Sequence, residues 1–443
     1  MGVAESLTRL RDHLPAAGRR VLDAGAREVS RVLPERARVR LAPAHARFGP
    51  DDVPPPPKVP AMPVRLYVGP ANYAGQGHAW ARAAERLPGV GAVSMAAVRP
   101  GSFAFAVDDA VPEPVYSLSR RWQRERRALL PRFTHVMVEA GRPLLGQLVR
   151  GGALAEARWL AERGVAVAIV CHGSEIRLPS RHREREPWSP FTPDWELTAV
   201  LEERAARLAR GLDRLGLPVL VSTPDLLLDV PAATWLPVVV DVERWAGAGQ
   251  RGVLEREVPV VVHAPSSSHV KGSELAEPVL ESLAARGLIE YRRVEGVPAG
   301  DMPRVYGEAD VVLDQLRIGN YGVAACEAMA AGRVVVSHVS EVVREHAREA
   351  AGADLPILEA TADSLEQVLL DVLADRERRA GGRRLAAQRA RGGPSSPAAP
   401  ARLARGEGGV LVGVGQLDRY LGEEAARDVP LAPAVERARA GVG

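Results

Sequence analysis

The sequence predicts an α/β protein in which two Rossmann-like domains face each other across a cleft. Its 443 residues exceed what a single hydrophobic core usually supports. Apolar, strand-like segments alternate with helical ones, as they do in parallel α/β sheets. The alternation stops at the Gly-rich stretch 246–252 and then starts again. Two such sets joined by a connection place a ligand cleft between the domains.

An extension precedes the first domain over residues 1–62. The first 50 residues contain ten arginines against five acidic residues, and the apolar residues from Val3 to Leu14 are spaced as one helical face. The Pro-rich segment that follows is typical of an extended linker. Because a basic amphipathic segment can lie on anionic lipid, residues 1–50 predict peripheral contact with the inner membrane face. An arm that packs on the body or on a partner is the alternative.

The first Rossmann-like domain is predicted over residues 63–245. A strand that starts at Val64 leads into a Gly-rich turn and a helix, which is a βαβ opening. A helix is predicted over 144–163 and is followed by the apolar strand Val165–Cys171, which ends in the loop HGSEIRLPS. A second helix, rich in Arg, Glu and Leu, is predicted over 196–215.

The second Rossmann-like domain is predicted over residues 256–380. The strand VPVVVHAP is followed by a Ser-rich loop and a helix, and further strands include LIEYRRV and RVVVSHV. The remaining residues, 381–443, begin with a segment dominated by Arg, Ala, Gly and Pro. Helical periodicity is lost in that segment, so we expect disorder or poor packing there.

Composition excludes several classes of protein. The 58 basic and 55 acidic residues nearly balance, so no nucleic-acid partner is indicated. Cys171 and Cys326 lie far apart without metal-ligand spacing, which indicates neither a zinc site nor a disulfide framework. The first 20 residues lack the apolar run that a signal peptide needs, and no stretch approaches the length of a spanning helix. The expected localisation is cytoplasmic.

The most informative stretch is GNYGVAACEAMAAG, from Gly319 to Gly332. It places a Gly-flanked loop at the end of a strand and Glu327 one turn inside the next helix. Helix starts of this kind collect phosphates and ribose, because their amides point at the ligand. An ordinary helix start with a buried Ala/Met face is the alternative.

This stretch resembles the donor loop of GT-B-fold glycosyltransferases of the family 4, or group 1, type. In that family Glu, seven residues and a second Glu precede Ala-Met-Ala-x-Gly. The resemblance implies that Glu327 holds the ribose hydroxyls and that Asn320, Tyr321 and Gly322 help to bind the donor. The first Glu of the pattern falls on Gly319, which makes the contact with the donor sugar different. The resemblance also implies the GT-B fold, a nucleotide-sugar co-substrate and no cofactor.

A second segment, VVHAPSSSHVKGSE, puts Lys271 at a helix start after a strand and a Ser-rich turn. The chain is rich in arginine and has lysine only at Lys58 and Lys271, which favours a chemical requirement for Lys271. Its ammonium can neutralise a departing pyrophosphate. A solvated helix-start lysine is the alternative. The segment resembles the Arg-x4-Lys-Gly donor-phosphate motif of the same family, with Lys271 and Gly272 matching and Ser266 at the arginine position.

The first βα turn, ANYAGQGHA, carries Gly75 and Gly77, which would let backbone amides approach a ligand. A third glycine at dinucleotide spacing is missing, which argues against an NAD fingerprint. In the resembled family this loop faces the donor phosphates and the acceptor, so Asn72 and Tyr73 are acceptor-side candidates. A purely structural turn role for Asn72 is the alternative, because Asn tolerates left-handed backbone angles.

The segment CHGSEIR follows an apolar strand and so puts His172 at the carboxyl edge of the first sheet, where such folds bind ligands. The family resemblance places a histidine here against the donor sugar, and we expect His172 and Lys271 to be the catalytic residues. A capping or core histidine is the alternative. Glu175 and Trp188 are further acceptor-side candidates, since aromatic faces suit sugars and apolar aglycones.

The predicted reaction needs no metal. No DxD triplet occurs, and the pair Asp108–Asp109 lies in a presumed loop without a third ligand. The resemblance implies retaining transfer from a nucleotide-sugar to a glycan, a lipid-linked acceptor or a small molecule. Two alternatives stay open. One is a sugar-nucleotide epimerase that would use His263 and His338. The other is a non-catalytic nucleotide-sugar-binding scaffold subunit, which the residues Gly319 and Ser266 motivate.

Overall fold

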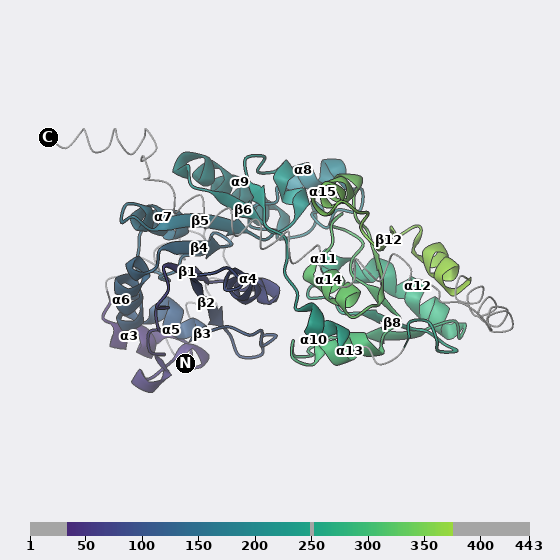
Figure 1. Ribbon diagram of the computed structural model, residues 1–443, viewed down its shortest axis with the longest axis horizontal. Coiled ribbons are helices and arrows are strands. Elements are labelled where there is room, and N and C mark those ends of the chain that lie inside the picture. The colour runs from purple at the N-terminus through teal and green to yellow at the C-terminus, as the bar shows by residue number, and fades with distance from the viewer. Residues whose placement is uncertain (1–32, 249–251, 375–443) are drawn as a thin grey trace.

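Two α/β domains lie side by side along the long axis of the molecule (Figure 1). The computed structural model describes residues 33–248 and 252–374. The amphipathic segment expected at the start of the chain lies largely outside these ranges, and the low-complexity segment with which residues 381–443 begin lies wholly outside them. Within them, no helix is both long enough and apolar enough to cross a membrane.

A seven-stranded sheet forms the centre of the first domain, with the order β3-β2-β1-β4-β5-β6-β7 and every neighbouring pair parallel. The strands are β1 (Val64–Gly69), β2 (Val90–Val98), β3 (Asp109–Pro112), β4 (His135–Glu139), β5 (Ala166–Cys171), β6 (Val219–Val221) and β7 (Thr234–Trp235). Every residue of β4 is buried, as expected for a parallel sheet covered on both faces.

Helices cover this sheet and lead to the second domain (Figure 1). They are α3 (Glu35–Leu41), α4 (Gln76–Ala84), α5 (Glu113–Leu118), α6 (Arg120–Leu129), α7 (Gly152–Ala161), α8 (Pro179–Arg185) and α9 (Thr198–Leu215), with the 3-10 turns η3 (Tyr73–Gly75) and η5 (Pro224–Leu228). The next helix, α10 (Val242–Ala246), buries its Trp245 in a core cluster of the second domain. The longest, α9, ends at Gly216, whose positive φ of 66° gives the left-handed cap that glycine supplies.

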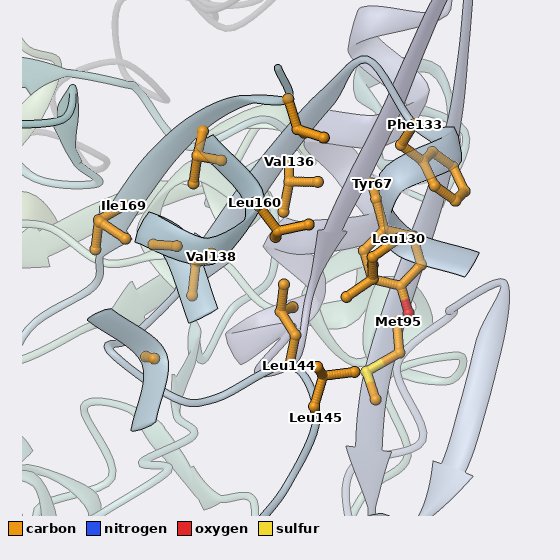
Figure 2. Packing of buried hydrophobic residues seen from close by; sticks show 14 of the residues in the cluster. Tyr67, Met95, Leu130, Phe133, Val136, Val138, Leu144, Leu145, Leu160 and Ile169 are labelled. Carbon is orange, nitrogen blue, oxygen red and sulfur yellow. The ribbon is translucent and has the colours of Figure 1, made fainter. Parts of the chain in front are cut away.

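The larger core of the first domain fills the space between the sheet and one layer of helices. Leu160 of α7 lies beside Val136 and Val138 of β4, and the Tyr67 ring meets Phe133 edge on with ring centroids 5.0 Å apart (Figure 2). Burial of each such side chain is worth about 1.5–3 kcal/mol. This packing fixes the strands whose ends carry the site.

The second domain has a five-stranded parallel sheet in the order β12-β11-β10-β8-β9. Its elements are β8 (Val260–His263), α11 (Ser268–Lys271), α12 (Ser273–Ala285), β9 (Glu290–Arg293), α13 (Met302–Glu308), β10 (Val311–Leu313), α14 (Val323–Ala330), β11 (Val334–Ser337), α15 (Glu341–Ala351) and β12 (Ile357–Glu359). Two apolar clusters, one on each face, bury this sheet.

The strand order reverses once in each sheet, between β1 and β4 in the first and between β8 and β10 in the second. Loops that leave neighbouring strands at such a point turn to opposite faces, so a crevice opens at the carboxyl ends of the strands. The strand ends that border the two crevices are Gly69, Glu139, His263 and Leu313. The predicted pair of Rossmann-like domains is confirmed.

Two details of the sequence interpretation are wrong. Asp109 does not lie in a loop: it begins β3, is buried, and has its carboxylate 3.0 Å from the Arg126 guanidinium. The predicted helix over 144–163 is shorter, because α7 begins only at Gly152. The Glu156 carboxylate accepts hydrogen bonds from the amides of Leu144 and Leu145, which holds the preceding segment in a turn.

Candidate functional site

A cavity of about 1610 Å³ lies between the two domains. Its first-domain wall comes from the loops that follow β1, β4 and β5, and its second-domain wall from the loop after β8 and the start of α14. Pockets for one small ligand usually occupy about 300–1,000 Å³, so this cavity has room for two substrates at once.

Lys271 and Glu327 line the same wall of this pocket. Lys271 is the last residue of α11, where Gly272 ends the helix with a positive φ of 76° and then caps α12. Its Nζ lies 2.6 Å from Oδ1 of Asp314, whose side chain is 1 % exposed. The Oδ2 atom of Asp314 accepts a hydrogen bond of 2.8 Å from the Gly322 amide, at the start of α14. The phosphate-binding cation predicted from the sequence therefore has a buried carboxylate as its partner.

Glu327 projects from the second turn of α14 into the same pocket. Burial raises the pKa of its carboxyl to about 8; the charge of Arg244 on α10 acts against this rise and that of Asp314 adds to it. Glu327 thus takes up a proton more readily than a free glutamate. A ligand that offers it hydroxyl donors would stabilise the ionised form, since hydrogen bonds to a carboxylate favour its charge.

Arg177 and Arg317, two arginines that could replace the cation that Ser266 does not supply, are both paired with carboxylates. Ser266 lines the pocket as predicted. Arg177, which also lines it, is committed to Asp225, with Nε 2.8 Å and Nη2 2.5 Å from Oδ2 of that carboxylate. Arg317 pairs with Glu274 and donates to the Ser189 carbonyl. Among the second-domain residues that line the pocket, Lys271 is the one with a basic side chain.

On the opposite wall His172 sits at the end of β5, as predicted, next to a residue that the sequence reasoning missed. Nε2 of His172 lies 3.2 Å from Oε1 of Glu139, a fully buried carboxylate at the end of β4. Burial by itself lowers the pKa of His172, but the Glu139 carboxylate raises it more, so the net pKa is above the usual value. The rings of Tyr73 and Trp80 pack against the imidazole.

Glu139 also organises the first βα turn. Its Oε2 atom accepts hydrogen bonds from the amides of Ala71 at 3.0 Å and Asn72 at 2.9 Å. A Cβ atom at Gly77 would stand 2.9 Å from both carboxylate oxygens, so glycine is needed there to make room for Glu139. One buried carboxylate thus joins the turn after β1 to the histidine after β5.

Strained backbone is concentrated on the first-domain wall of the pocket. Among the described residues, five other than glycine have a positive φ, and four of these line the pocket: Asn72, Ala74, Ala104 and Ala140. Such conformations cost about 1–3 kcal/mol each and gather at functional sites. The Asn72 side chain makes hydrogen bonds inside the domain, since it donates to the Ala106 carbonyl and accepts from the His78 amide. This supports the structural turn role for Asn72.

The remaining acceptor-side candidates differ in exposure and position. Tyr73 is 46 % exposed at the pocket and stays available to a ligand. Glu175 lines the pocket, but its carboxylate caps the backbone amides of His172 and Gly173. Arg142 also lines the pocket, although the sequence did not point to it. Its Nη2 atom lies 3.4 Å from Oε2 of Glu113.

The departure at Gly319 has a structural reason. Gly319 has a φ of +69°, and a Cβ atom there would come within 2.2 Å of Oε1 of Glu186, a residue of the first domain. Oε2 of Glu186 lies 2.8 Å from Nε2 of His338, and Nδ1 of His338 lies 2.6 Å from Oε1 of Glu359. No side chain at position 319 could fit without displacing this interdomain contact.

The loop that carries Asn320 also meets the first domain. Nδ2 of Asn320 donates to Oδ1 of Asp225 at 2.8 Å, and Nε2 of His182 lies 3.1 Å from the Ile318 carbonyl oxygen. Both contacts are buried. The predicted donor loop is thus held by contacts with the opposite domain as well as by its own sheet.

The structure brings most of the predicted site residues to one pocket. The pocket is lined by His172, Lys271, Glu327, Ser266, Asn320, Tyr321, Gly322, Asn72, Tyr73 and Glu175. Five predicted residues do not line it: Gly75, Gly77, Trp188, Gly272 and Gly319. Gly75 packs against Phe105 and Gly272 against Arg317. Phe105 and Glu139 occupy the space beside Gly75 and Gly77, and the Gly75 amide donates to the Asn72 carbonyl at 3.0 Å; a contact of these two glycines with a ligand stays a prediction.

Two missed residues, Glu139 and Asp314, share a sequence signal that could have found them. Glu139 is the last residue of β4, and Asp314 directly follows β10. Both are carboxylates at the carboxyl end of a strand that borders a switch point, where ligands bind in such folds. Within the described ranges, no three His, Cys, Asp or Glu side chains come together as a metal-ligand set.

No protein-family model matches the chain, and no curated protein matches it. Solved structures do. The catalytic domain of starch synthase IV from Arabidopsis thaliana, bound to ADP and acarbose, aligns with a TM-score of 0.50 at 9% identity over 83% of this chain and 100% of that one. HepE from Anabaena, in complex with UDP and glucose, aligns with a TM-score of 0.47 at 12% identity over 81% of this chain and 99% of the other.

At such identities the likeness shows the fold. The two facing parallel sheets, with the pocket between their carboxyl edges, are those of the GT-B fold. The fold that the sequence predicted is confirmed.

Proposed function

We propose that this protein is a glycosyltransferase that moves a sugar from a nucleotide-sugar donor to an acceptor hydroxyl. One observation carries the proposal: the Lys271 ammonium and the Glu327 carboxylate line one wall of an interdomain pocket, beside the start of α14, in a GT-B fold. A cation with a helix start suits a diphosphate, and a carboxylate suits ribose hydroxyls. The catalytic domain of starch synthase IV, which has the same fold, is bound to ADP and acarbose in its structure.

In the proposed reaction the bond between the anomeric carbon and the diphosphate oxygen breaks, and the nucleoside diphosphate leaves with the electron pair. Lys271 stabilises the charge that develops on the leaving oxygen. The acceptor oxygen forms the new bond to the anomeric carbon on the same face, and its proton passes to the departing phosphate. Transfer then retains the anomeric configuration, and the proposal assigns no role to a metal or another cofactor.

The first-domain wall would bind the sugar and the acceptor. His172 is proposed to donate a proton in a hydrogen bond to a hydroxyl of the donor sugar, because the neighbouring Glu139 carboxylate raises the pKa of its imidazole. Tyr73 offers an exposed aromatic face next to it. A glycan, a lipid-linked acceptor or a small molecule in the cytoplasm could approach along this wall.

The test is a donor panel. The full chain is incubated with UDP-, GDP-, ADP- and dTDP-sugars, with and without a chelator, and nucleotide release and products are followed by chromatography and NMR. We expect release from one donor, insensitive to the chelator, with the α or β configuration of that donor kept in the product.

The matched control is Glu327→Gln, which keeps the size of the side chain and removes its charge. We expect it to lower kcat/KM for the donor about 10²-fold, as expected for the loss of about 3 kcal/mol of substrate binding. A change in the sugar of the intact nucleotide-sugar would indicate an epimerase instead. Binding of a nucleotide-sugar without turnover would indicate a scaffold subunit, and no binding at all would contradict every one of these readings.

A further inference from the structure

A buried carboxylate, that of Asp314, lies next to Lys271 on the second-domain wall of the pocket, which we call the donor wall. Oδ1 of Asp314 is 2.6 Å from Nζ of Lys271, and Oδ2 accepts a hydrogen bond of 2.8 Å from the Gly322 amide. The Asp314 side chain is 1 % exposed, whereas Lys271 and Gly322 both line the pocket. Asp314 is therefore bound to the two groups that an incoming phosphate would use.

We propose that Asp314 limits the affinity of the donor wall for phosphate and favours release of the nucleoside diphosphate product. The inference rests on the proposed function, because it concerns the same donor site. It assigns to Asp314 the role of a specificity-determining residue that acts through Lys271 and Gly322.

The charges near the site support this role. The Asp314 carboxylate offsets the charge of Lys271, and Ser266 adds no second cation. Arg177 is already paired with Asp225, and Arg317 with Glu274. The positive charge of Lys271, which a bound diphosphate would contact, is therefore already partly neutralised by Asp314. Two unit charges about 5 Å apart interact by about 3 kcal/mol at an effective dielectric constant near 20, so the opposing effect of Asp314 is large.

The hydrogen bond from Gly322 strengthens the argument. An amide at the start of a helix is normally a ready donor for a phosphate oxygen. Here that donor is used by Asp314. A Cβ atom at Gly322 would lie 3.1 Å from Nζ of Lys271 and 3.4 Å from both Asp314 oxygens, so the three groups are tightly packed. A phosphate can gain the Gly322 amide only by competing with Asp314.

Donor and product differ in charge, so the competition with Asp314 affects their binding to different extents. A free nucleoside diphosphate carries about one more negative charge at neutral pH than the same diphosphate esterified to a sugar, because its terminal phosphate has a second ionisation with a pKa near 6. A fixed negative charge opposes the more negative ligand more strongly. Asp314 therefore weakens product binding more than donor binding.

The experiment measures binding to the full chain by isothermal titration calorimetry. Wild type and Asp314→Asn are titrated with UDP, ADP and GDP, and the base that binds is then examined as its nucleoside, monophosphate, diphosphate and diphosphate-sugar. We expect Asp314→Asn to bind the diphosphate about tenfold more tightly, to bind the diphosphate-sugar less than tenfold more tightly, and to leave nucleoside affinity within twofold.

Two further variants serve as a charge control and as a second test of Asp314. Glu295→Gln removes a charge elsewhere on the pocket lining, where Glu295 pairs with Arg293, and it should not reproduce the dependence on phosphate charge. Asp314→Ser carries the same expectation as Asp314→Asn and replaces it if that variant does not fold, as judged by circular dichroism.

The outcomes separate the two proposals. If wild type binds a nucleotide and both Asp314 variants bind the diphosphate equally or more weakly, Asp314 only positions Lys271, and this inference is overturned. A gain that is equal for nucleoside and diphosphate overturns it as well. If neither wild type nor the variants bind any nucleotide, the proposed function fails, and this inference fails with it.

Discussion

At the scale of single residues, the first-domain half of the site depends on Glu139. The Glu139 carboxylate is fully buried, accepts from the amides of Ala71 and Asn72, and lies 3.2 Å from His172. A buried charge of this kind persists only where hydrogen bonds and opposite charge compensate its desolvation. Glu139 is therefore best described as a positioning residue that acts through His172.

Glu139→Gln is the corresponding test, because it keeps the shape and removes the charge. We expect the pKa of His172 to fall, since burial, which lowers it, is then no longer opposed by the carboxylate. The alkaline limb of the pH profile of kcat should move to lower pH, while KM for the donor stays within about threefold. NMR titration of His172 measures the pKa directly, and an unchanged pKa would contradict the role.

Gly319 provides a second residue-scale prediction. Its φ of +69° disfavours any side chain, and a Cβ atom would come within 2.2 Å of Oε1 of Glu186. A positive φ alone costs a non-glycine residue about 1–3 kcal/mol, so Gly319→Ala, which adds the contact with Glu186, should destabilise the fold by more than that, as measured by urea unfolding. Gly352 is a matched control with a φ of +66° and nothing near its Cβ position. Gly352→Ala should cost only the free energy of placing a side chain on a backbone with positive φ. An equal cost at both positions would rule out an effect of the contact with Glu186.

At the scale of elements, the ends of β11 and β12 meet α8 through His338. His338 directly follows β11, with Glu186 just past α8 on one side and Glu359 at the end of β12 on the other. Glu359 also accepts from the Val339 amide and from Arg344. Both ring nitrogens of His338 face carboxylates, which requires the imidazole to hold two protons.

This arrangement has a pH dependence with a definite sign. Burial lowers the pKa of His338, but the hydrogen bonds to Glu186 and Glu359 raise it more, to about 9. Because the folded pKa exceeds the ordinary value of 6.5, the stabilisation is fully present below pH 6.5 and is lost as pH rises through about 9. Wild type should thus exceed His338→Gln in Tm at pH 6.5, and the difference should shrink by pH 9.5. A constant difference would contradict a charged His338.

Elements were easier to predict from the sequence than contacts. The alternation of apolar strands and helices carries a periodic signal, and the ends of β5 and β10 locate His172 and the donor loop. The short strand β3 has only four residues and escaped notice. The contacts of His172 with Glu139 and of Lys271 with Asp314 could not be predicted. The residues of these pairs are 33 and 43 positions apart, and hydrophobic periodicity indicates only local structure.

At the scale of the whole molecule, the two domains are joined by buried and partly buried polar contacts around the donor loop. Asn320 donates to Asp225, His182 meets the Ile318 carbonyl, and His338 meets Glu186. On the other side of the pocket, the Ala299 amide donates to the Phe103 carbonyl. The relative position of the domains and the shape of the donor loop therefore depend on each other.

Two substitutions at this junction should differ strongly in their effect on stability. Asn320→Ala leaves Asp225 paired with Arg177 and should cost about 1 kcal/mol, the value of one hydrogen bond. Asp225→Asn leaves Arg177, which is 5 % exposed, as an uncompensated buried charge and should cost about 3–5 kcal/mol. Urea unfolding measures both. Equal costs would mean that the Asp225 carboxylate does not compensate the buried charge of Arg177.

The pairing at the junction also has a consequence for the order in which the chain is made. Domains generally fold as units, the N-terminal one first, as they leave the ribosome. Asp225 already has Arg177 from its own domain, and Glu139 has His172, so these carboxylates are compensated before the second sheet exists. Glu186 instead contacts His338, 152 positions further along the chain. During synthesis the contact between Glu186 and His338 therefore cannot form until the second domain has folded and docked on the first.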